Sequence, residues 1–184
     1  MSKAHRFNSR ARWIAAALAL LVAQLSPTLA QATTISGQAE VLTPYSFKLQ
    51  DYEVFLLGVD SVEVKQTCTV SGKIWECWAA AQRQLETMLS EGEVTCESML
   101  EQHSPKRMIA LCTVNGEDVG QRLVASGFGL ALPKETSRYN DAQTDARVAG
   151  IGLWQGTFTN PSAWRSLAIR AQSNRPQFTG KPID

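Results

Sequence analysis

Two of the four cysteines lie in neighbouring runs of β-forming residues, and their spacing restricts the fold more than any other feature. Cys96 lies within residues 94–99 and Cys112 within residues 107–114, and a polar segment separates the two runs. A hairpin centred near Ser104 would place the cysteines directly opposite each other, at a separation that suits a disulfide. The sequence therefore predicts two antiparallel strands joined by a Cys96–Cys112 bridge.

The remaining cysteines, Cys68 and Cys77, are then expected to form a second disulfide that closes a short loop. Four cysteines allow three pairings, and the hairpin favours this one. A zinc site is the alternative, but neither pair has metal-finger spacing, and His103 is the only histidine after residue 32. The same shortage of histidine excludes mechanisms that need a histidine base, including the Ser-His-Asp triad.

Residues 1–32 have the pattern of a secretory signal peptide. Four Lys or Arg and no acidic residue accompany an apolar stretch over residues 13–25, which is short for a membrane span, and small residues follow it. We predict cleavage after Ala32, with Ala30 as the alternative. The protein is therefore expected to be exported, either periplasmic or secreted, in an oxidising environment that permits disulfides.

The rest of the chain has the length of one domain. We expect this domain over residues 33–170 and a disordered tail over residues 171–184, which hold two prolines and few apolar side chains. All 17 acidic residues but only 14 of the 18 Lys and Arg follow residue 32, so the exported part has a net charge of −3. Proteins that bind nucleic acid nonspecifically usually present a basic face, and this net charge gives no argument for one.

The hydrophobic pattern changes period along the domain. Three short runs within residues 35–59 have the alternating or continuous apolar character of strands. Apolar residues between positions 75 and 89 then recur at helical spacing, and Gly92, Gly127 and Gly150 end this helix and two later ones. With the cysteine hairpin, this order predicts a mainly β, α+β fold. We expect a five-stranded barrel of the OB type with about three helices.

Two carboxylates follow the third predicted strand. Asp60 and Glu63 come three residues apart after the apolar run Leu56-Leu57-Gly58-Val59, and Arg107 begins a later strand. Such a set can hold a divalent metal and a phosphodiester. The alternative is structural. In that case Asp60 accepts a turn amide, Glu63 pairs with Lys65, and Arg107 pairs with one of the two carboxylates.

Several separated motifs resemble those of the staphylococcal-nuclease-like (thermonuclease) family over residues 35–165, and they look closest to its exported branch with extra cysteines. They are Leu57-Gly58-Val59-Asp60-Ser61-Val62-Glu63, Gln66-Thr67-Cys68, Gly72-x-x-Trp75-x-Cys77, Arg107-x-x-Ala110-x-Cys112, Leu123-Val124-x-x-Gly127 and Ala146-Arg147-x-x-Gly150-x-Gly152-Leu153-Trp154. The resemblance implies calcium-dependent hydrolysis of DNA and RNA. By position it assigns Asp60 and the Ser61 carbonyl to the metal, Glu63 to activating water, and Arg107 to the phosphate.

Two positions depart from the family pattern in ways that change the site. Tyr45 stands where the resemblance requires a first calcium aspartate, and Phe55 where it requires a second phosphate-binding arginine. Ca²⁺ takes about six to eight oxygen ligands, and a charge-clamping arginine is worth ~10³–10⁵ in the rate of phosphoryl transfer. The sequence therefore predicts a weak or vestigial site, with Ca²⁺ as the cofactor that the resemblance implies.

Two functions remain open. In the first, the exported domain keeps the fold but little or no nuclease activity, and is a monomeric binding or structural module for single-stranded nucleic acid, an oligosaccharide or a protein, away from membranes. In the alternative it is an active metal-dependent nuclease or phosphodiesterase that uses Asp60, Glu63 and Arg107. Tyr45 and Phe55 discriminate between them. If they close the cleft beside Asp60, the first function is favoured, whereas a cation that enters from elsewhere in the chain favours the second.

Overall fold

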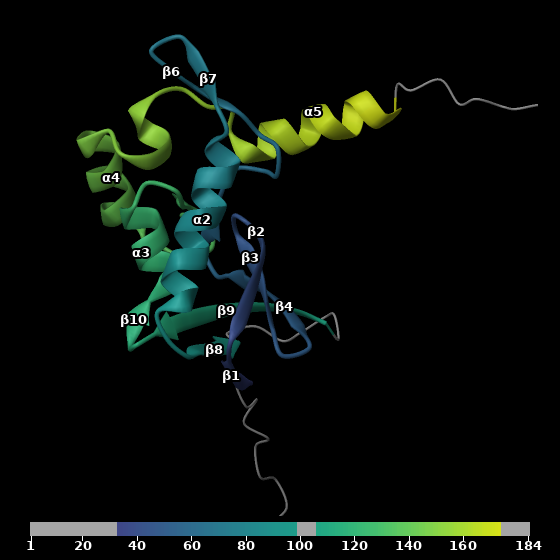
Figure 1. Cartoon of the computed structure of the whole chain (residues 1–184), viewed down its shortest axis with the longest axis vertical. Coiled ribbons are helices and arrows are strands. Elements are labelled where there is room, and N and C mark those ends of the chain that lie inside the picture. The colour runs from purple at the N-terminus through teal and green to yellow at the C-terminus, as the bar shows by residue number, and fades with distance from the viewer. Residues whose placement is uncertain (1–32, 99–105, 174–184) are drawn as a thin grey trace, which may run out of the picture. The chain divides into compact units, whose positions relative to one another are not determined.

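The computed structural model describes residues 33–98 and 106–173, which Figure 1 shows as ribbons. The expected signal peptide and the hairpin turn near Ser104, with His103, lie outside the described residues. So does the chain beyond residue 173. Among the described residues, no helix has the length and apolar character needed to cross a membrane.

The main sheet has seven strands in the order β1-β8-β9-β4-β3-β2, with β10 paired to β9. Strands β1 and β2 lie at opposite ends of this order but are separated in the chain by Gln38 alone, so the sheet curls into a half-barrel (Figure 1). The strands are β1 (Thr34–Gly37), β2 (Ala39–Thr43), β3 (Ser46–Leu49), β4 (Tyr52–Leu56), β8 (Val94–Ser98), β9 (Arg107–Val114) and β10 (Glu117–Asp118).

The predicted α+β class with a curled sheet is confirmed, whereas the expected strand count differs. Seven strands replace five because the first expected strand divides at Gln38. Its first half pairs with β8 and its second half with β3. In addition, β10 extends the sheet beside β9. The division lets one stretch of chain hydrogen-bond to both ends of the sheet, which a single straight strand could not do.

Alternating burial explains why β8 and β9 form the centre of the core. Side chains in a strand point to opposite faces in turn, and in β9 Met108, Ala110, Cys112 and Val114 are all buried. Cys96 on β8 lies directly opposite Cys112, and the two form a disulfide. The second disulfide joins Cys68 and Cys77. Both predicted bridges are therefore confirmed.

Two short pairs of strands lie outside the main sheet. Strand β5 (Val59–Asp60) pairs with β11 (Leu130–Ala131). Strands β6 (Cys68–Val70) and β7 (Lys73–Trp75) form a hairpin next to the Cys68–Cys77 bridge. The pairing of β5 is important for the site, because it fixes the backbone that carries Asp60.

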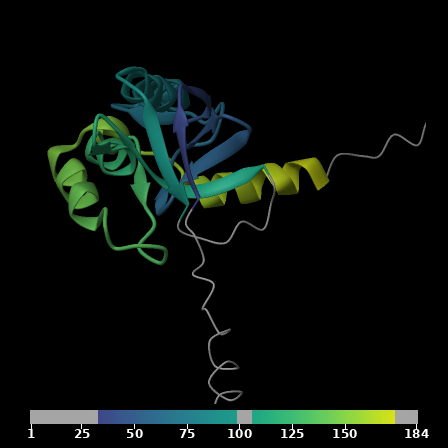
Figure 2. The same ribbon diagram turned by 90° about the horizontal axis from the view of Figure 1, so that it is seen from below.

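The described residues form four α-helices and one 3₁₀ helix. Helices α2 (Cys77–Ser90), α3 (Val119–Ala125) and α4 (Asn140–Ala149) correspond to the three that were expected, and Gly150 ends α4 in a left-handed conformation. The 3₁₀ helix η2 covers Gly152–Gln155. The prediction of about three helices missed α5 (Pro161–Ser173), which also extends three residues past the expected domain boundary at residue 170. Figures 1 and 2 show α5 extending away from the helices α3 and α4.

Three tryptophans pack around the Cys68–Cys77 bridge. Trp75, Trp78 and Trp154 are partly buried against a small core that contains both cysteines and Leu153. Trp154 also makes an edge-to-face contact with Phe158, with ring centroids 5.3 Å apart. These aromatic rings therefore have a structural role, and stabilise the segment that leads into α5.

Candidate functional site

Asp60 is positioned by a sharp turn between two strands. Leu57 and Gly58 leave β4, and Gly58 has a positive φ of 73°. The backbone then enters β5, where Asp60 is paired with Leu130 of β11. A Cβ atom at Gly58 would lie 2.2 Å from Cγ2 of Thr136, so the segment before α4 packs directly on this turn. Glycine is required here by both conformation and space.

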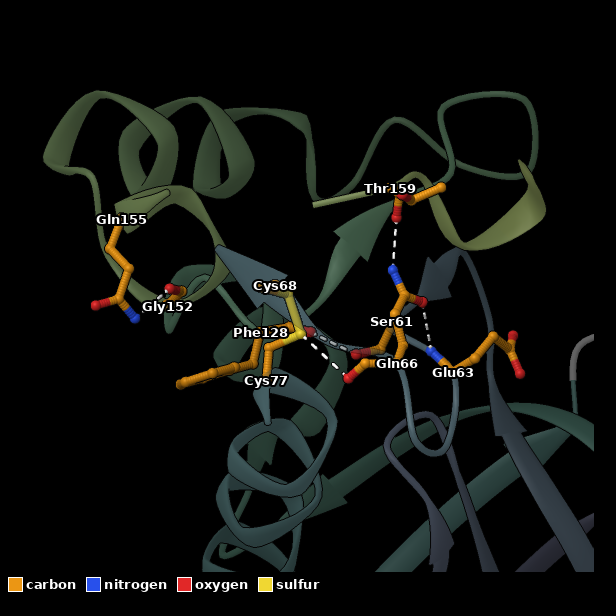
Figure 3. Close-up of a disulfide and its surroundings, with 9 residues drawn as sticks. All are labelled: Ser61, Glu63, Gln66, Cys68, Cys77, Phe128, Gly152, Gln155 and Thr159. Carbon is orange, nitrogen blue, oxygen red and sulfur yellow. Dashed lines mark hydrogen bonds between the residues drawn. A yellow bond between two sulfur atoms is a disulfide. The ribbon is translucent and has the colours of Figure 1, made fainter. Parts of the chain in front are cut away.

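Glu63 is positioned by a buried glutamine that joins two distant segments. The Gln66 side chain is fully buried; its Oε1 accepts the Glu63 amide at 3.0 Å and its Nε2 donates to the Thr159 carbonyl at 2.6 Å. Figure 3 shows this amide between the two main-chain groups, with the Glu63 side chain extending away from the Cys68–Cys77 disulfide. The loop after β5 is therefore held to the segment that begins α5.

Arg165 of α5 lies between the two carboxylates, which we call the carboxylate pair. Its Nη2 donates to Asp60 Oδ2 at 2.8 Å, and its Nη1 donates to Asp60 Oδ1 at 3.2 Å and also to Glu63 Oε1. The hydrogen bonds to Asp60, together with the one to Glu63, raise the pKa of Arg165 above its usual value. The side chains of Asp60 and Glu63 are 14% and 17% exposed, against 41% for Arg165. The guanidinium therefore covers the pair from the solvent side.

Tyr45 donates a hydrogen bond to the fourth oxygen of the carboxylate pair, which Arg165 does not contact. Its hydroxyl donates to Glu63 Oε2 at 3.0 Å, and its ring lies 6.3 Å from that of Phe55. Burial, and then the negative charge of Glu63, raise the pKa of Tyr45 to about 12. The tyrosine that replaces an expected metal ligand is therefore a hydrogen-bond donor to the site, and its own oxygen is kept protonated.

Arg107 does not join the carboxylate pair. Its Nε lies 3.6 Å from Oε2 of Glu53, and its guanidinium lies 4.6 Å from the centre of the Phe55 ring. Glu53 is its neighbour because β4 and β9 are parallel, with Glu53 opposite Arg107. The expectation that Arg107 pairs with Asp60 or Glu63 is therefore wrong. Glu63 contacts Tyr45, the Tyr45 ring lies beside that of Phe55, and the Phe55 ring lies against Arg107. Two aromatic rings therefore link Glu63 to Arg107, which do not contact each other directly.

One other expectation is wrong: Glu63 pairs with Arg165 of α5 and not with Lys65. Ser61, whose carbonyl the resemblance assigns to the metal, is fully buried, and its hydroxyl donates to the Phe128 carbonyl at 2.7 Å. The proposed turn role of Asp60 is confirmed, because its Oδ1 accepts the Ser61 amide at 2.9 Å.

The donor set does not fit the Ca²⁺ ion that the resemblance implies. Each of the four carboxylate oxygens of Asp60 and Glu63 accepts a hydrogen bond, three of them from Arg165 and one from Tyr45. A cation placed between them would meet a guanidinium that already neutralises one of the two charges. Within the part of the chain that the structure describes, no group of three or more His, Cys, Asp or Glu side chains is arranged to hold a metal.

Comparisons with known proteins leave the family open. No protein-family model matches the chain, and no curated protein matches it significantly. The resemblance to staphylococcal-nuclease-like proteins therefore remains an expectation from the motifs.

The raised pKa of Tyr45 leads to a pH-dependent stability. A tyrosine whose pKa is raised by folding contributes stability that is present below its unfolded pKa, about 10, and is lost as the pH rises through the folded value. We expect the contribution of Tyr45 to disappear between pH 10 and about 12. The test measures the free energy of unfolding of wild type and of Tyr45→Phe across this range. The stability advantage of wild type over the variant should decrease as the pH rises, and a constant difference would contradict the contact with Glu63.

Proposed function

We propose that this protein is an exported, non-catalytic binding module of the staphylococcal-nuclease-like class. One observation supports the loss of catalysis above all others: the four oxygens of Asp60 and Glu63 accept hydrogen bonds from Arg165 and Tyr45. A carboxylate that is to bind metal or take a proton from water needs a free oxygen. The pair instead fixes the start of α5 to the strands.

The fold supports the proposed class. The strands form a curled sheet in which the stretch 34–43 contributes to both ends, as an OB-type barrel requires. Helix α2 follows the β6–β7 hairpin, and the later helices follow β9, in the order that the motifs imply. The two disulfides support an oxidising compartment, and hence export.

A groove beside Arg107 offers a surface for an anionic ligand. It has a volume of about 840 Å³ and includes neither Asp60 nor Glu63; its lining residues are Leu42, Lys48, Asp51, Tyr52, Glu53, Lys106 and Arg107. Its three cations, one of them the exposed guanidinium of Arg107, together with the ring of Tyr52, suit the phosphates and bases of single-stranded nucleic acid. The two acids in the groove moderate this charge, so we expect weak binding that is sensitive to salt.

The active-nuclease alternative has one observation in its favour, because a guanidinium does enter the site from elsewhere in the chain. An arginine that assists phosphodiester hydrolysis directs its N–H groups to the phosphate. In Arg165, Nη1 and Nη2 both donate to the carboxylates themselves. In the same structure Tyr45 lies against Glu63, with Phe55 beside it. These contacts favour the binding module over the enzyme.

The test uses fluorescently labelled single-stranded DNA with the purified protein and its Glu63→Gln variant. With Ca²⁺, with other divalent ions and with chelator, we expect no cleavage above that of the variant. The anisotropy of the same DNA should show salt-sensitive binding of equal strength in both proteins, since Glu63 lies outside the groove. Metal-dependent cleavage that disappears in Glu63→Gln would refute the proposal and establish the nuclease alternative.

A further inference from the structure

Helix α5 is attached to the domain through its beginning. Upstream of it, Thr157 and Thr69 exchange backbone hydrogen bonds of 2.8 and 2.9 Å, and the Thr159 carbonyl is held by Gln66. Pro161 is buried, and Arg165, one turn later, reaches the carboxylate pair. Of the residues that follow, Ser166, Leu167, Ile169 and Ala171 are exposed, Leu167 by 56% and Ile169 by 66%. The Arg165 contact therefore joins a largely exposed helix to the site.

The charges around this contact make it a substitute for a bound ion. Asp60 and Glu63 share one guanidinium nitrogen, Nη1, so their negative charges lie close together in a site that is mostly withdrawn from water. Two adjacent carboxylates repel each other unless a cation lies between them. Arg165 meets this requirement permanently, because arginine remains protonated at every pH at which the protein is folded.

Tyr45 contacts the one oxygen of the pair that Arg165 leaves free. Its hydroxyl occupies Glu63 Oε2, the one carboxylate oxygen that Arg165 does not contact. An ion that approached from solvent would first meet the guanidinium, which is 41% exposed, and not the carboxylates beneath it. Access to the pair therefore requires that the Arg165 guanidinium moves away from it.

We propose that Arg165 is an autoinhibitory contact: helix α5 places an internal cation on the carboxylate pair, so that the Arg165 contact and binding of a divalent ion at Asp60 and Glu63 exclude each other. This inference rests on the proposed function in one respect, the occupied carboxylate oxygens. It concerns binding of the ion and not hydrolysis. Since Tyr45 and Phe55 remain in place of the other catalytic groups, an exposed pair would hold an ion without restoring cleavage.

The test measures binding of Tb³⁺, a probe for Ca²⁺ sites whose emission is sensitised by a nearby tyrosine such as Tyr45. Wild type is expected to give no sensitised emission that depends on Glu63. Arg165→Ala and the longer Arg165→Gln should both bind Tb³⁺ at least about tenfold more tightly than wild type, because removing one partner leaves two uncompensated carboxylates. Excess Ca²⁺ should displace the probe.

Two controls assign the effect to the pair. Lys73→Ala removes one positive charge from an exposed position on β7 and should leave Tb³⁺ binding unchanged. Adding Glu63→Gln to Arg165→Ala should abolish the gain. Folded Arg165 variants with no gain, or a gain that survives Glu63→Gln, would overturn the proposal. Glu63-dependent binding of Tb³⁺ to wild type would also overturn the proposal, and this measurement does not depend on whether an Arg165 variant folds. DNA cleavage by wild type would refute the proposed function by a separate readout.

Discussion

Removal of the Cys96–Cys112 bridge in a Cys96→Ala/Cys112→Ala variant should lower the free energy of unfolding by about 3 kcal/mol, since the bridge closes a loop of medium length. The two cysteines are 16 residues apart and lie opposite each other on β8 and β9. They are 0% and 1% exposed, so the alanines also leave a small cavity in the core. In a domain of this size we expect the melting temperature to fall by about 6–12 °C.

Thermal unfolding in oxidising and in reducing buffer checks this expectation. Under oxidising conditions the variant should unfold well below wild type. In reductant the unfolded wild-type chain also loses the constraint, so the difference should shrink to that of the side chains alone. A matched Cys68→Ala/Cys77→Ala variant, whose loop spans 9 residues, should lose slightly less. If the Cys96–Cys112 variant loses equal stability in both buffers, the bridge does not act by constraining the unfolded chain.

This hairpin is the part of the fold that local sequence predicts best. Its strands have alternating apolar residues, and its two cysteines leave one register that can join them. The end of α4 could be predicted equally well, because Gly150 adopts the left-handed conformation that a helix end often requires. In each case, the residues that decide the structure are close together in the chain or share a covalent constraint.

Arg165 could not be assigned to the site in the same way. It is separated from Asp60 by 105 residues and from Glu63 by 102. A helix beginning at Pro161 was predictable, because proline favours the first position of a helix. Its direction depends on Gln66, whose buried amide holds Thr159. A side chain that reaches a distant site through tertiary packing leaves no periodic signal in its own segment.

One local sequence signal, the pair Asn115-Gly116, indicates a strand that the apolar pattern does not predict. Asn115 and Gly116 both have positive φ, 52° and 82°, and join β9 to β10. Asn-Gly is the residue pair most typical of a two-residue hairpin turn. This turn adds β10 to the sheet, and Asp118 at its end accepts the Gln121 amide at the start of α3. A strand of two residues has too little apolar periodicity to be seen by pattern alone.

The second large effect is expected for Gly127→Ala, which should destabilise the protein by about 3 kcal/mol or more. Gly127 has a φ of 76°, and a Cβ there would lie 2.3 Å from the Ile151 carbonyl oxygen. The strain of a left-handed alanine is therefore added to an overlap with backbone, which cannot move aside as a side chain can. The Gly127 carbonyl also accepts the Leu153 amide at 2.9 Å, so the end of α3 is joined directly to η2.

Gly116→Ala separates the two causes. Gly116 has a similar φ of 82°, but a Cβ there would meet nothing within 4 Å. It should therefore cost only the conformational strain, about 1–2 kcal/mol. Urea unfolding of both variants measures the difference. Equal losses of stability in the two variants would mean that the backbone around Ile151 shifts to relieve the overlap. If the contact is rigid, Gly127→Ala should also disturb Phe128, whose carbonyl holds the Ser61 hydroxyl beside Asp60, and so loosen the Arg165 contact in hydrogen exchange of α5.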